Sequence, residues 1–228
     1  MAWYCWVCLN KGDAMKIYDE LPQHLEDGTA NPVWLSLRAG KFTGSDFHQY
    51  MGLAKKDELS DTAESNLYKK VLESVGYLFE SYRSSAMEDG NENEPLARAD
   101  YIAETFNDVH EVGFVDWEQM RAGCSPDGVM YGTDGQIEKI LEIKCPEIKN
   151  YLKMAKGKIP PVYMTQMQYN MLITGTKSCD FVVWHPDMRL SVQEIKADAN
   201  YQKDIMTVLE KLNARYDVIL EEIKEFRK

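Results

Sequence analysis

The sequence has no long apolar run, although 44% of its 228 residues are hydrophobic. Charged residues interrupt every apolar stretch before it reaches the roughly 20 residues that a membrane-spanning helix needs. Residues 1–8 are apolar, but they lack a basic start and are followed by polar residues rather than by a cleavage site. We therefore expect a cytoplasmic protein with no membrane association, in which residues 1–8 form an aromatic anchor.

Soft metal ligands are also scarce. The five cysteines are an odd number spread along the chain, which fits reduced thiols better than a disulfide framework. Cys5 and Cys8 form a C-x-x-C pair, but a cluster normally needs four thiolates and no other cysteines are grouped to complete one, so buried apolar thiols are the preferred interpretation. The histidines have no ligand-like spacing and are expected to be structural: His24, His48, His110 and His185.

Positive charge is in deficit, with 26 Lys and Arg against 37 Asp and Glu. A net charge of −11 argues against general nucleic-acid binding, because duplex affinity depends on phosphate neutralisation by basic side chains. The distribution of charge matters more than its sum. Acidic residues gather at 57–64, 88–94 and 221–225, whereas lysines gather at 149–158. We expect a locally positive channel on an acidic outer surface.

One segment concentrates ionisable groups. Asp127, in a Pro-Asp-Gly turn, is followed after a spacer of 14 residues by a Glu-Ile-Lys sequence, Glu142 to Lys144. Residues 128–144 have the pattern of two strands joined by a Gly-Thr-Asp-Gly turn, a hairpin that brings Asp127 back beside Glu142. Because side chains alternate along a strand, Glu142 and Lys144 share one face and Ile143 points to the other.

These groups suit a hard metal ion. Two carboxylates, from Asp127 and Glu142, and the main-chain carbonyl of Ile143 are oxygen ligands that Mg²⁺ prefers and that Mn²⁺ also accepts. A lysine beside the metal can orient an attacking water and offset negative charge, which are the needs of phosphodiester hydrolysis. The alternative is an ordinary turn followed by an amphipathic strand with solvated charges. The abrupt end of the strand at Pro146, just after Lys144, argues against it.

The Pro-Asp, spacer and Glu-x-Lys pattern resembles the PD-(D/E)XK nuclease superfamily, and flanking sequences narrow the resemblance. Those sequences lie at residues 34–38, 43–45, 122–128, 141–146 and 163–171. They look like the phage lambda exonuclease (YqaJ-type viral recombinase) family, and they occur in the family's order in a chain of about its length. The resemblance covers most of residues 34–228, whereas residues 1–30 lie outside it.

The resemblance implies a two-metal-type, Mg²⁺-dependent 5′-to-3′ exonuclease on linear double-stranded DNA. Such an enzyme prefers a 5′-phosphorylated end, releases mononucleotides and leaves a 3′ overhang for recombination by strand annealing. It also implies a ring-shaped homotrimer, a phage single-strand annealing protein as partner, and a phage or prophage origin in a bacterial host. The trimer cannot be derived from these residues. A closed ring would, however, account for processive digestion, because it encloses the product strand.

The resemblance extends to outer residues of the metal site. Glu94 matches a Gly-x-x-x-Glu helix-start motif whose Glu is an outer metal-site carboxylate, with Glu92 as a close competitor. The alternative for Glu94 is a helix-start acid that complements the macrodipole. Gln166 matches a residue that contacts DNA phosphate, whereas Tyr169, on the same helix face, could be simple core packing.

Three further residues match a pocket for the 5′-terminal phosphate. These are Arg38, Ser45 and Ser125, and a guanidinium fork with hydroxyl donors suits a dianionic phosphate. The alternatives are a surface arginine, a helix cap and a turn serine. Met87 falls where the family places an apolar wedge between separating strands, although a core methionine is the default interpretation.

Two other functions stay open. One is a PD-(D/E)XK endonuclease or RecB-like nuclease module with no requirement for a DNA end. The other is a catalytically inert module that binds DNA ends. The intact Asp127, Glu142 and Lys144 argue against the second.

Helical and strand periodicities predict an α/β protein of the α+β type, with a central mixed β-sheet flanked by helices. The resemblance implies that this sheet forms a PD-(D/E)XK restriction-endonuclease-like core. Its length suits one nuclease domain over residues 1–228. Helices are expected at 34–40, 47–53, 62–84, 96–106, 161–174 and 200–226. Strands are expected at 109–115, in the hairpin 128–144, and at 180–185 and 190–195.

Overall fold

The computed structural model describes residues 15–25, 27–77, 79 and 85–227, with side chains for all of them but 85–92. The helices are α1 (Pro32–Arg38), α2 (Gly44–Phe47), α3 (Asp61–Ser74), α4 (Ser85–Thr105), α5 (Ile148–Met154), α6 (Pro161–Thr174) and α7 (Ala199–Phe226), with the 3-10 helices η2 (His48–Ala54) and η3 (Glu118–Met120). The strands are β1 (Lys16–Tyr18), β2 (Phe42–Thr43), β3 (Phe114–Trp117), β4 (Ala122–Cys124), β5 (Gly128–Tyr131), β6 (Ile137–Lys144), β7 (Ser178–Val183) and β8 (Ser191–Lys196).

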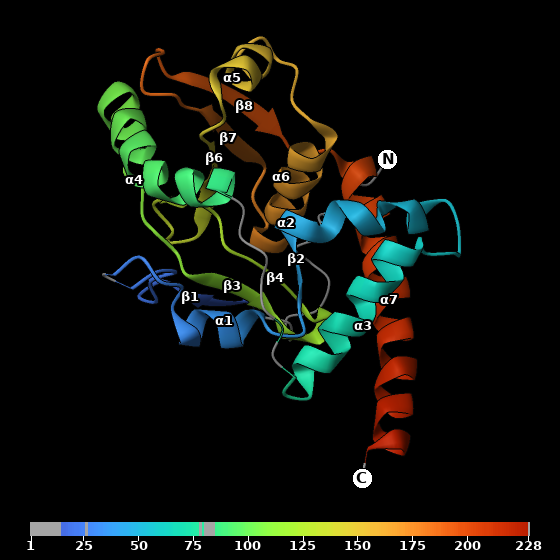
Figure 1. Ribbon diagram of the computed structural model, residues 1–228. Coiled ribbons are helices and arrows are strands. Elements are labelled where there is room, and N and C mark those ends of the chain that lie inside the picture. The colour runs from blue at the N-terminus through green and yellow to red at the C-terminus, as the bar shows by residue number, and fades with distance from the viewer. Residues whose placement is uncertain (1–14, 26, 78, 80–84, 228) are drawn as a thin grey trace.

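The strands form two four-stranded sheets, ordered β1-β3-β4-β2 and β5-β6-β7-β8 (Figure 1). Each sheet mixes orientations, because β2 pairs with β4 and β6 pairs with β7 in parallel while the other neighbours are antiparallel. Pro126 lies between β4 of one sheet and β5 of the other. Because a proline has no N–H to donate to a neighbouring strand, it suits this break between the sheets. The expected mixed α/β class is confirmed, with its strands divided between two sheets.

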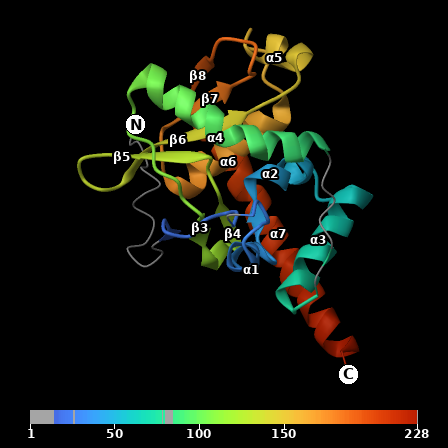
Figure 2. The same ribbon diagram turned by 60° about the vertical axis from the view of Figure 1, so that its left-hand side comes forward.

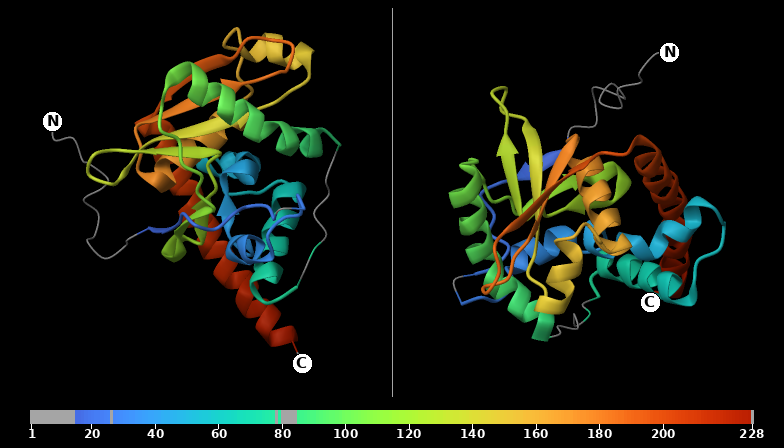
Figure 3. Two further views of the ribbon diagram at one scale, coloured as in Figure 1. Left: turned by 90° about the vertical axis from the view of Figure 1, so that its left-hand side faces the viewer. Right: turned by 90° about the horizontal axis from the view of Figure 1, so that it is seen from above.

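Helices cover both faces of the β5–β8 sheet, as the view from above shows (Figure 3). On one face, Ala97 and Tyr101 of α4 pack against Leu141 and Ile143 of β6. On the other face, α6 contacts β6 and β7 and contributes Met167 to the larger core. Residues 140–143 of β6 are therefore buried on both faces, which explains the apolar residues that flank Glu142.

The larger core joins the two sheets through a shared layer of helices. Val115 of β3 and Phe181 of β7 belong to the same cluster as Leu209 of α7. Helix α7 runs along this layer and past it toward the C-terminus (Figure 2). Within the described residues, none of the helices combines the length and apolar character that crossing a lipid bilayer requires.

Helix α2 meets α6 at very short range. A Cβ added at Gly44 would lie 2.3 Å from Oδ1 of Asn170, so only glycine fits at this crossing. The contact holds the end of β2 and the start of α2 against the helix that carries Gln166 and Asn170.

Several expected boundaries are wrong. Helix α3 ends at Ser74 rather than at residue 84, because Gly76 has φ +94°, a conformation that terminates helices. Helix α4 begins at Ser85 rather than at residue 96, and Pro95 lies inside it. Because an interior proline removes one helical hydrogen bond, Pro95 wrongly indicated that the helix begins after it. Helix α5 was not expected, and residues 47–53 form the end of α2 and η2 instead of one α-helix.

The strand expected at 109–115 is also displaced. Strand β3 begins at Phe114, and His110 makes only an isolated bridge to Val129. The hairpin, α6, α7, β7 and β8 agree with the expected ranges to within two residues. Helix α6 begins at Pro161 and is followed by Gly175, and α7 begins after the N-cap Asp198, so residues of the kinds that mark helix ends are visible in the sequence.

Candidate metal-dependent active site

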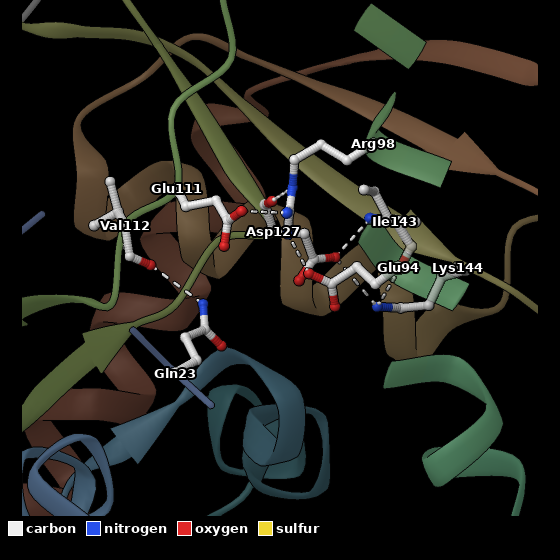
Figure 4. Close-up of polar contacts among 8 residues, drawn as sticks. All are labelled: Gln23, Glu94, Arg98, Glu111, Val112, Asp127, Ile143 and Lys144. Atoms are coloured by element: carbon white, nitrogen blue, oxygen red, sulfur yellow. Dashed lines mark hydrogen bonds and ion pairs between the residues drawn. The ribbon is translucent and has the colours of Figure 1, made fainter. Parts of the chain in front are cut away.

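The β5–β6 hairpin brings the two acids of the sequence motif together. Gly128 pairs with Leu141, and the Asp127 N–H donates to the Leu141 carbonyl at 3.1 Å. The Asp127 carboxylate folds back over the end of β6, where Oδ2 accepts from the Ile143 N–H at 2.6 Å (Figure 4). The acid at the turn therefore lies beside Glu142, although 14 residues separate the two in the sequence.

Lys144 lies among the three oxygens expected to bind a metal. Its ammonium donates to the Glu142 carboxylate and, at 3.0 Å, to the Ile143 carbonyl. It also lies 4.0 Å from Oδ2 of Asp127. One cationic group thus contacts all three oxygens, which means that they surround a single point suited to positive charge.

Burial shifts the pKa values at this point. Glu142 is fully buried, and burial raises its pKa to about 7, against the lowering effect of Lys144 and with a further increase from Asp127. Burial alone would lower the pKa of Lys144, but Glu142 and Asp127 raise it above its ordinary value. The lysine is therefore held as an ammonium. The carboxylates around it repel one another, and added positive charge would offset this repulsion.

Glu94 reaches the same region from α4. Its carboxylate accepts from Nη2 of Arg98 at 2.5 Å, and burial together with the nearby Asp127 raises its pKa to about 8, despite Arg98. Arg98 is buried and also donates from Nε to the Asp127 carbonyl at 2.8 Å and from Nη1 to Glu111 at 2.6 Å (Figure 4). Sequence reasoning missed Arg98, and its only local signal is the i,i+4 spacing from Glu94.

Asn170 on α6 is a second residue that sequence reasoning missed. Its Nδ2 donates to the second carboxylate oxygen of Glu142 at 3.2 Å, so both Glu142 oxygens are held. Oδ1 of Asn170 is buried without a hydrogen-bond partner in the described part of the chain. Gln166, which lies one turn earlier on α6, is half-buried, and Tyr169 is a core residue whose hydroxyl donates to the Phe42 carbonyl at 2.7 Å.

The donor set fits a hard divalent cation. Among the residues whose side chains are described, no three His, Cys, Asp or Glu side chains are grouped closely enough to hold a metal by themselves. The candidate set is different, since it combines two carboxylates, from Asp127 and Glu142, with the Ile143 carbonyl. All three are oxygen donors already gathered around one ammonium group, and Glu94 adds a further carboxylate nearby.

A second cluster is built where α1 meets the end of β4. Nη1 of Arg38 and Nε1 of Trp34 each donate to the Ser125 hydroxyl at 3.0 Å, and that hydroxyl donates to the Gly113 carbonyl at 2.7 Å. The Arg38 guanidinium also lies over the Trp34 ring, 4.4 Å from its centroid. No carboxylate in the described residues forms an ion pair with Arg38, and burial lowers its pKa. A desolvated guanidinium of this kind favours an anionic ligand.

Ser45 lies near this cluster without joining it. Strands β2 and β4 are parallel with Thr43 opposite Gly123, so Ser45 and Ser125 each follow by two residues at the same edge of the sheet. The Ser45 hydroxyl contacts the Thr43 hydroxyl at 3.4 Å, and the described structure contains no hydrogen bond from it to the guanidinium or to Ser125. The side chains of Met87 and Glu92, and the Cys5-x-x-Cys8 segment, lie outside the described residues.

The two mixed sheets, with an acid at a turn beside a strand that ends in acid-x-lysine, define a PD-(D/E)XK-like fold. The YqaJ-like viral recombinase domain matches residues 33–177, and the chain belongs to that family. No curated protein matches the sequence.

Solved structures agree with this assignment. The chain is similar to LHK-Exo in complex with dAMP, with a TM-score of 0.73 and 29% identity over 86% of this chain and 97% of the other. It is similar to the alkaline exonuclease LHK-Exo from Laribacter hongkongensis, with a TM-score of 0.70 and 28% identity over 86% of this chain and 100% of the other. A phage-related exonuclease from Haemophilus somnus 129PT shares the fold, with a TM-score of 0.61 and 18% identity over 80% and 96% of the two chains.

Proposed function

We propose that this protein is a deoxyribonuclease, and specifically a Mg²⁺-dependent 5′-to-3′ exonuclease on linear double-stranded DNA that prefers 5′-phosphorylated ends. The observation that carries the proposal is the gathering of the Asp127, Glu142 and Ile143 oxygens around the Lys144 ammonium. Membership of the YqaJ-like family and similarity to an alkaline exonuclease support it.

The chain's own residues supply most of the proposed chemistry. Asp127, Glu142 and the Ile143 carbonyl hold the cation, with Glu94 as an outer carboxylate. A bound Mg²⁺ would polarise the scissile phosphate and lower the pKa of a coordinated water. Lys144, beside those oxygens, would orient that water and offset charge on the phosphorane.

Recognition of the strand end falls to the Arg38 cluster. The Arg38 guanidinium has no ion-pair partner in the described residues, and a terminal phosphate supplies the missing anion. Ser125 is two residues from Asp127, so their Cα atoms lie at most about 7 Å apart. One strand end can therefore occupy both clusters at once, and Ser45, at the neighbouring strand end, and Gln166 on α6 are proposed to complete the phosphate contacts.

Further features support a DNA-end substrate. Exposed lysines lie on α5, which follows β6, and in the loop after α5, although the whole chain carries a net charge of −11. We propose that they line the DNA channel: Lys149, Lys153, Lys156 and Lys158. The similar LHK-Exo has been crystallised with dAMP, a mononucleotide, which supports the release of mononucleotides by this chain as well.

The wider setting is also proposed. Residues 1–228 would form one nuclease domain, which the core shared by both sheets supports. The protein would act in the cytoplasm of a bacterial host as a phage or prophage product, assemble as a ring-shaped trimer, and deliver the 3′ overhang to a phage single-strand annealing protein. Met87 would wedge between the separating strands.

Timed digestion of end-labelled linear duplex tests the function. We expect Mg²⁺- or Mn²⁺-dependent release of mononucleotides from the 5′ strand, faster from phosphorylated than from unphosphorylated ends, and no attack on a closed circle. Cleavage of the circle would indicate the endonuclease alternative. Binding of DNA ends with no release of nucleotides in either metal would indicate the inert end-binding module.

A further inference from the structure

Arg98 makes contacts that link three segments of the site. Its Nη2 donates to Glu94 on α4, its Nη1 donates to Glu111 in the chain before β3, and its Nε donates to the Asp127 carbonyl in the turn before β5. The three distances lie between 2.5 and 2.8 Å, and the side chain is buried (Figure 4). One guanidinium therefore joins the helix acid to the main chain of the turn acid.

The arrangement requires an arginine. Three acceptors that lie in different directions are reached by three different nitrogens of one planar group, whereas a lysine ammonium on a flexible chain could not reproduce this fixed geometry. Glu111 is largely exposed and serves as the outer partner of the guanidinium. The chain beside it is held in turn by Gln23, whose Nε2 donates to the Val112 carbonyl at 3.2 Å.

Helix α4 has other contacts that hold it on the sheet. The Tyr101 hydroxyl donates to Oδ2 of Asp180 at 2.6 Å, and the Trp184 indole donates to Asp100 at 2.6 Å. Ala97 and Tyr101 also pack in the cluster between α4 and β6. The helix thus has its own anchors one turn away, and the Arg98 contacts are directed at Glu94 and the Asp127 turn.

We propose that Arg98 is a positioning residue, which holds the Glu94 carboxylate at a fixed place relative to the Asp127 turn and thereby sets the affinity of the site for a divalent cation. The inference rests on the proposed function of this site. Partners of this kind, which orient metal ligands without touching the metal, typically contribute 10- to 100-fold to metal affinity or activity.

The test measures Mn²⁺ binding by calorimetry on the full chain without DNA, and the Mn²⁺ concentration that gives half-maximal cleavage. We expect Arg98→Ala to weaken Mn²⁺ binding by about 10- to 100-fold, and Arg98→Lys, which keeps the charge but loses the fork, by about tenfold. The half-maximal concentration should rise in parallel, while the KM for DNA stays close to that of the unmodified protein. A role confined to folding would not move metal affinity at a temperature where every variant is folded.

Tyr101→Phe is the matched control, because it removes an anchor of the same helix and leaves the Arg98 contacts intact. It should lower the melting temperature without changing Mn²⁺ affinity. Unchanged Mn²⁺ affinity in folded Arg98→Lys, beside an unmodified protein that binds Mn²⁺ and cleaves DNA, would overturn the Arg98 inference alone, and this holds even if Arg98→Ala fails to fold. An unmodified protein that neither binds Mn²⁺ nor cleaves DNA would overturn the proposed function and this inference together.

Discussion

The two sheets build their clusters in different ways. On the β5–β8 sheet, a single hairpin gathers Asp127, Glu142 and Lys144 within 18 consecutive residues. Beside the β1-β3-β4-β2 sheet, Arg38 and Ser125 meet although 87 positions separate them, because α1 packs against the chain after β4. A cluster made by a hairpin can be predicted from spacing alone, whereas one made by packing distant segments cannot.

The clusters also differ in charge. The hairpin cluster has several carboxylates, of which Glu142 is fully buried, and burial raises the pKa of Glu142 to about 7 and that of Glu94 to about 8. The Arg38 cluster has a half-buried cation with no ion-pair partner in the part of the chain that the structure describes. The first cluster therefore favours a cation and the second an anion. Substitutions in the first should change metal binding or cleavage, whereas substitutions in the second should change the preference for a DNA end.

The largest expected effect comes from Lys144 in the hairpin cluster. Lys144→Ala should lower the cleavage rate by about 10²- to 10³-fold, because a charge-stabilising group at the reacting phosphate is lost. Mn²⁺ binding should persist, since the three oxygen ligands remain. Calorimetry and single-turnover digestion measure the two quantities, with Lys224→Ala on the exposed side of α7 as the control. Full cleavage by Lys144→Ala with metal bound would show that another group orients the water.

Arg38 in the second cluster should affect the choice of DNA end rather than the metal. Arg38→Ala should lower the preference for a 5′-phosphorylated over an unphosphorylated end by about 10- to 100-fold, because hydrogen bonds to charged groups contribute about 1.5–3 kcal/mol. Mn²⁺ affinity should not change. Competition between the two labelled ends measures the preference, with Arg215→Ala on α7 as the control. An undiminished preference would place the phosphate elsewhere.

Asn170 of α6 contacts the hairpin cluster through Glu142, so it tests whether a residue outside the hairpin contributes to metal binding. Asn170→Ala removes one of the two groups that hold the Glu142 carboxylate, so we expect Mn²⁺ binding to weaken by about tenfold. Thr165 lies on the same helix as Asn170, and Thr165→Val removes its hydroxyl contact to Tyr201 of α7 and leaves Glu142 untouched. The Mn²⁺ affinity of this variant should match that of the unmodified protein. Equal Mn²⁺ affinity for the two variants would mean that Asn170 only packs.

The smallest effect is expected from the exposed lysines that belong to neither cluster. Lys153→Ala should weaken duplex binding only modestly at moderate salt, while the slope of log affinity against log salt becomes shallower by about 1. Lys203→Ala, an exposed lysine on α7, is the matched control. Equal slopes for both variants would argue that α5 does not line the DNA channel. Binding titrations at several salt concentrations, with Ca²⁺ replacing Mg²⁺, supply the measurement.

The sequence predicted the fold class and the hairpin because their signals are local. Alternation along β6 and the turn before it place Asp127 beside Glu142 without reference to any other element. Arg98 and Asn170 escaped prediction for a physical reason. An i,i+4 Glu–Arg pair is indistinguishable in sequence from a solvated helix pair, and the partner of Asn170 lies 28 positions away on another element. The end of α3 and the start of α4 were misjudged because Gly76 and Pro95 have effects that depend on tertiary context.

The tripeptide Ser125-Pro126-Asp127 connects the two clusters, and its central proline fixes one backbone torsion. Under the proposed function, a stiff connector of this kind would keep the bound strand end and the bond to be cut a constant distance apart. We expect the size of the fragment removed in each cycle to be dictated by this short connector, and a residue inserted into it to alter the products even when every catalytic side chain is intact.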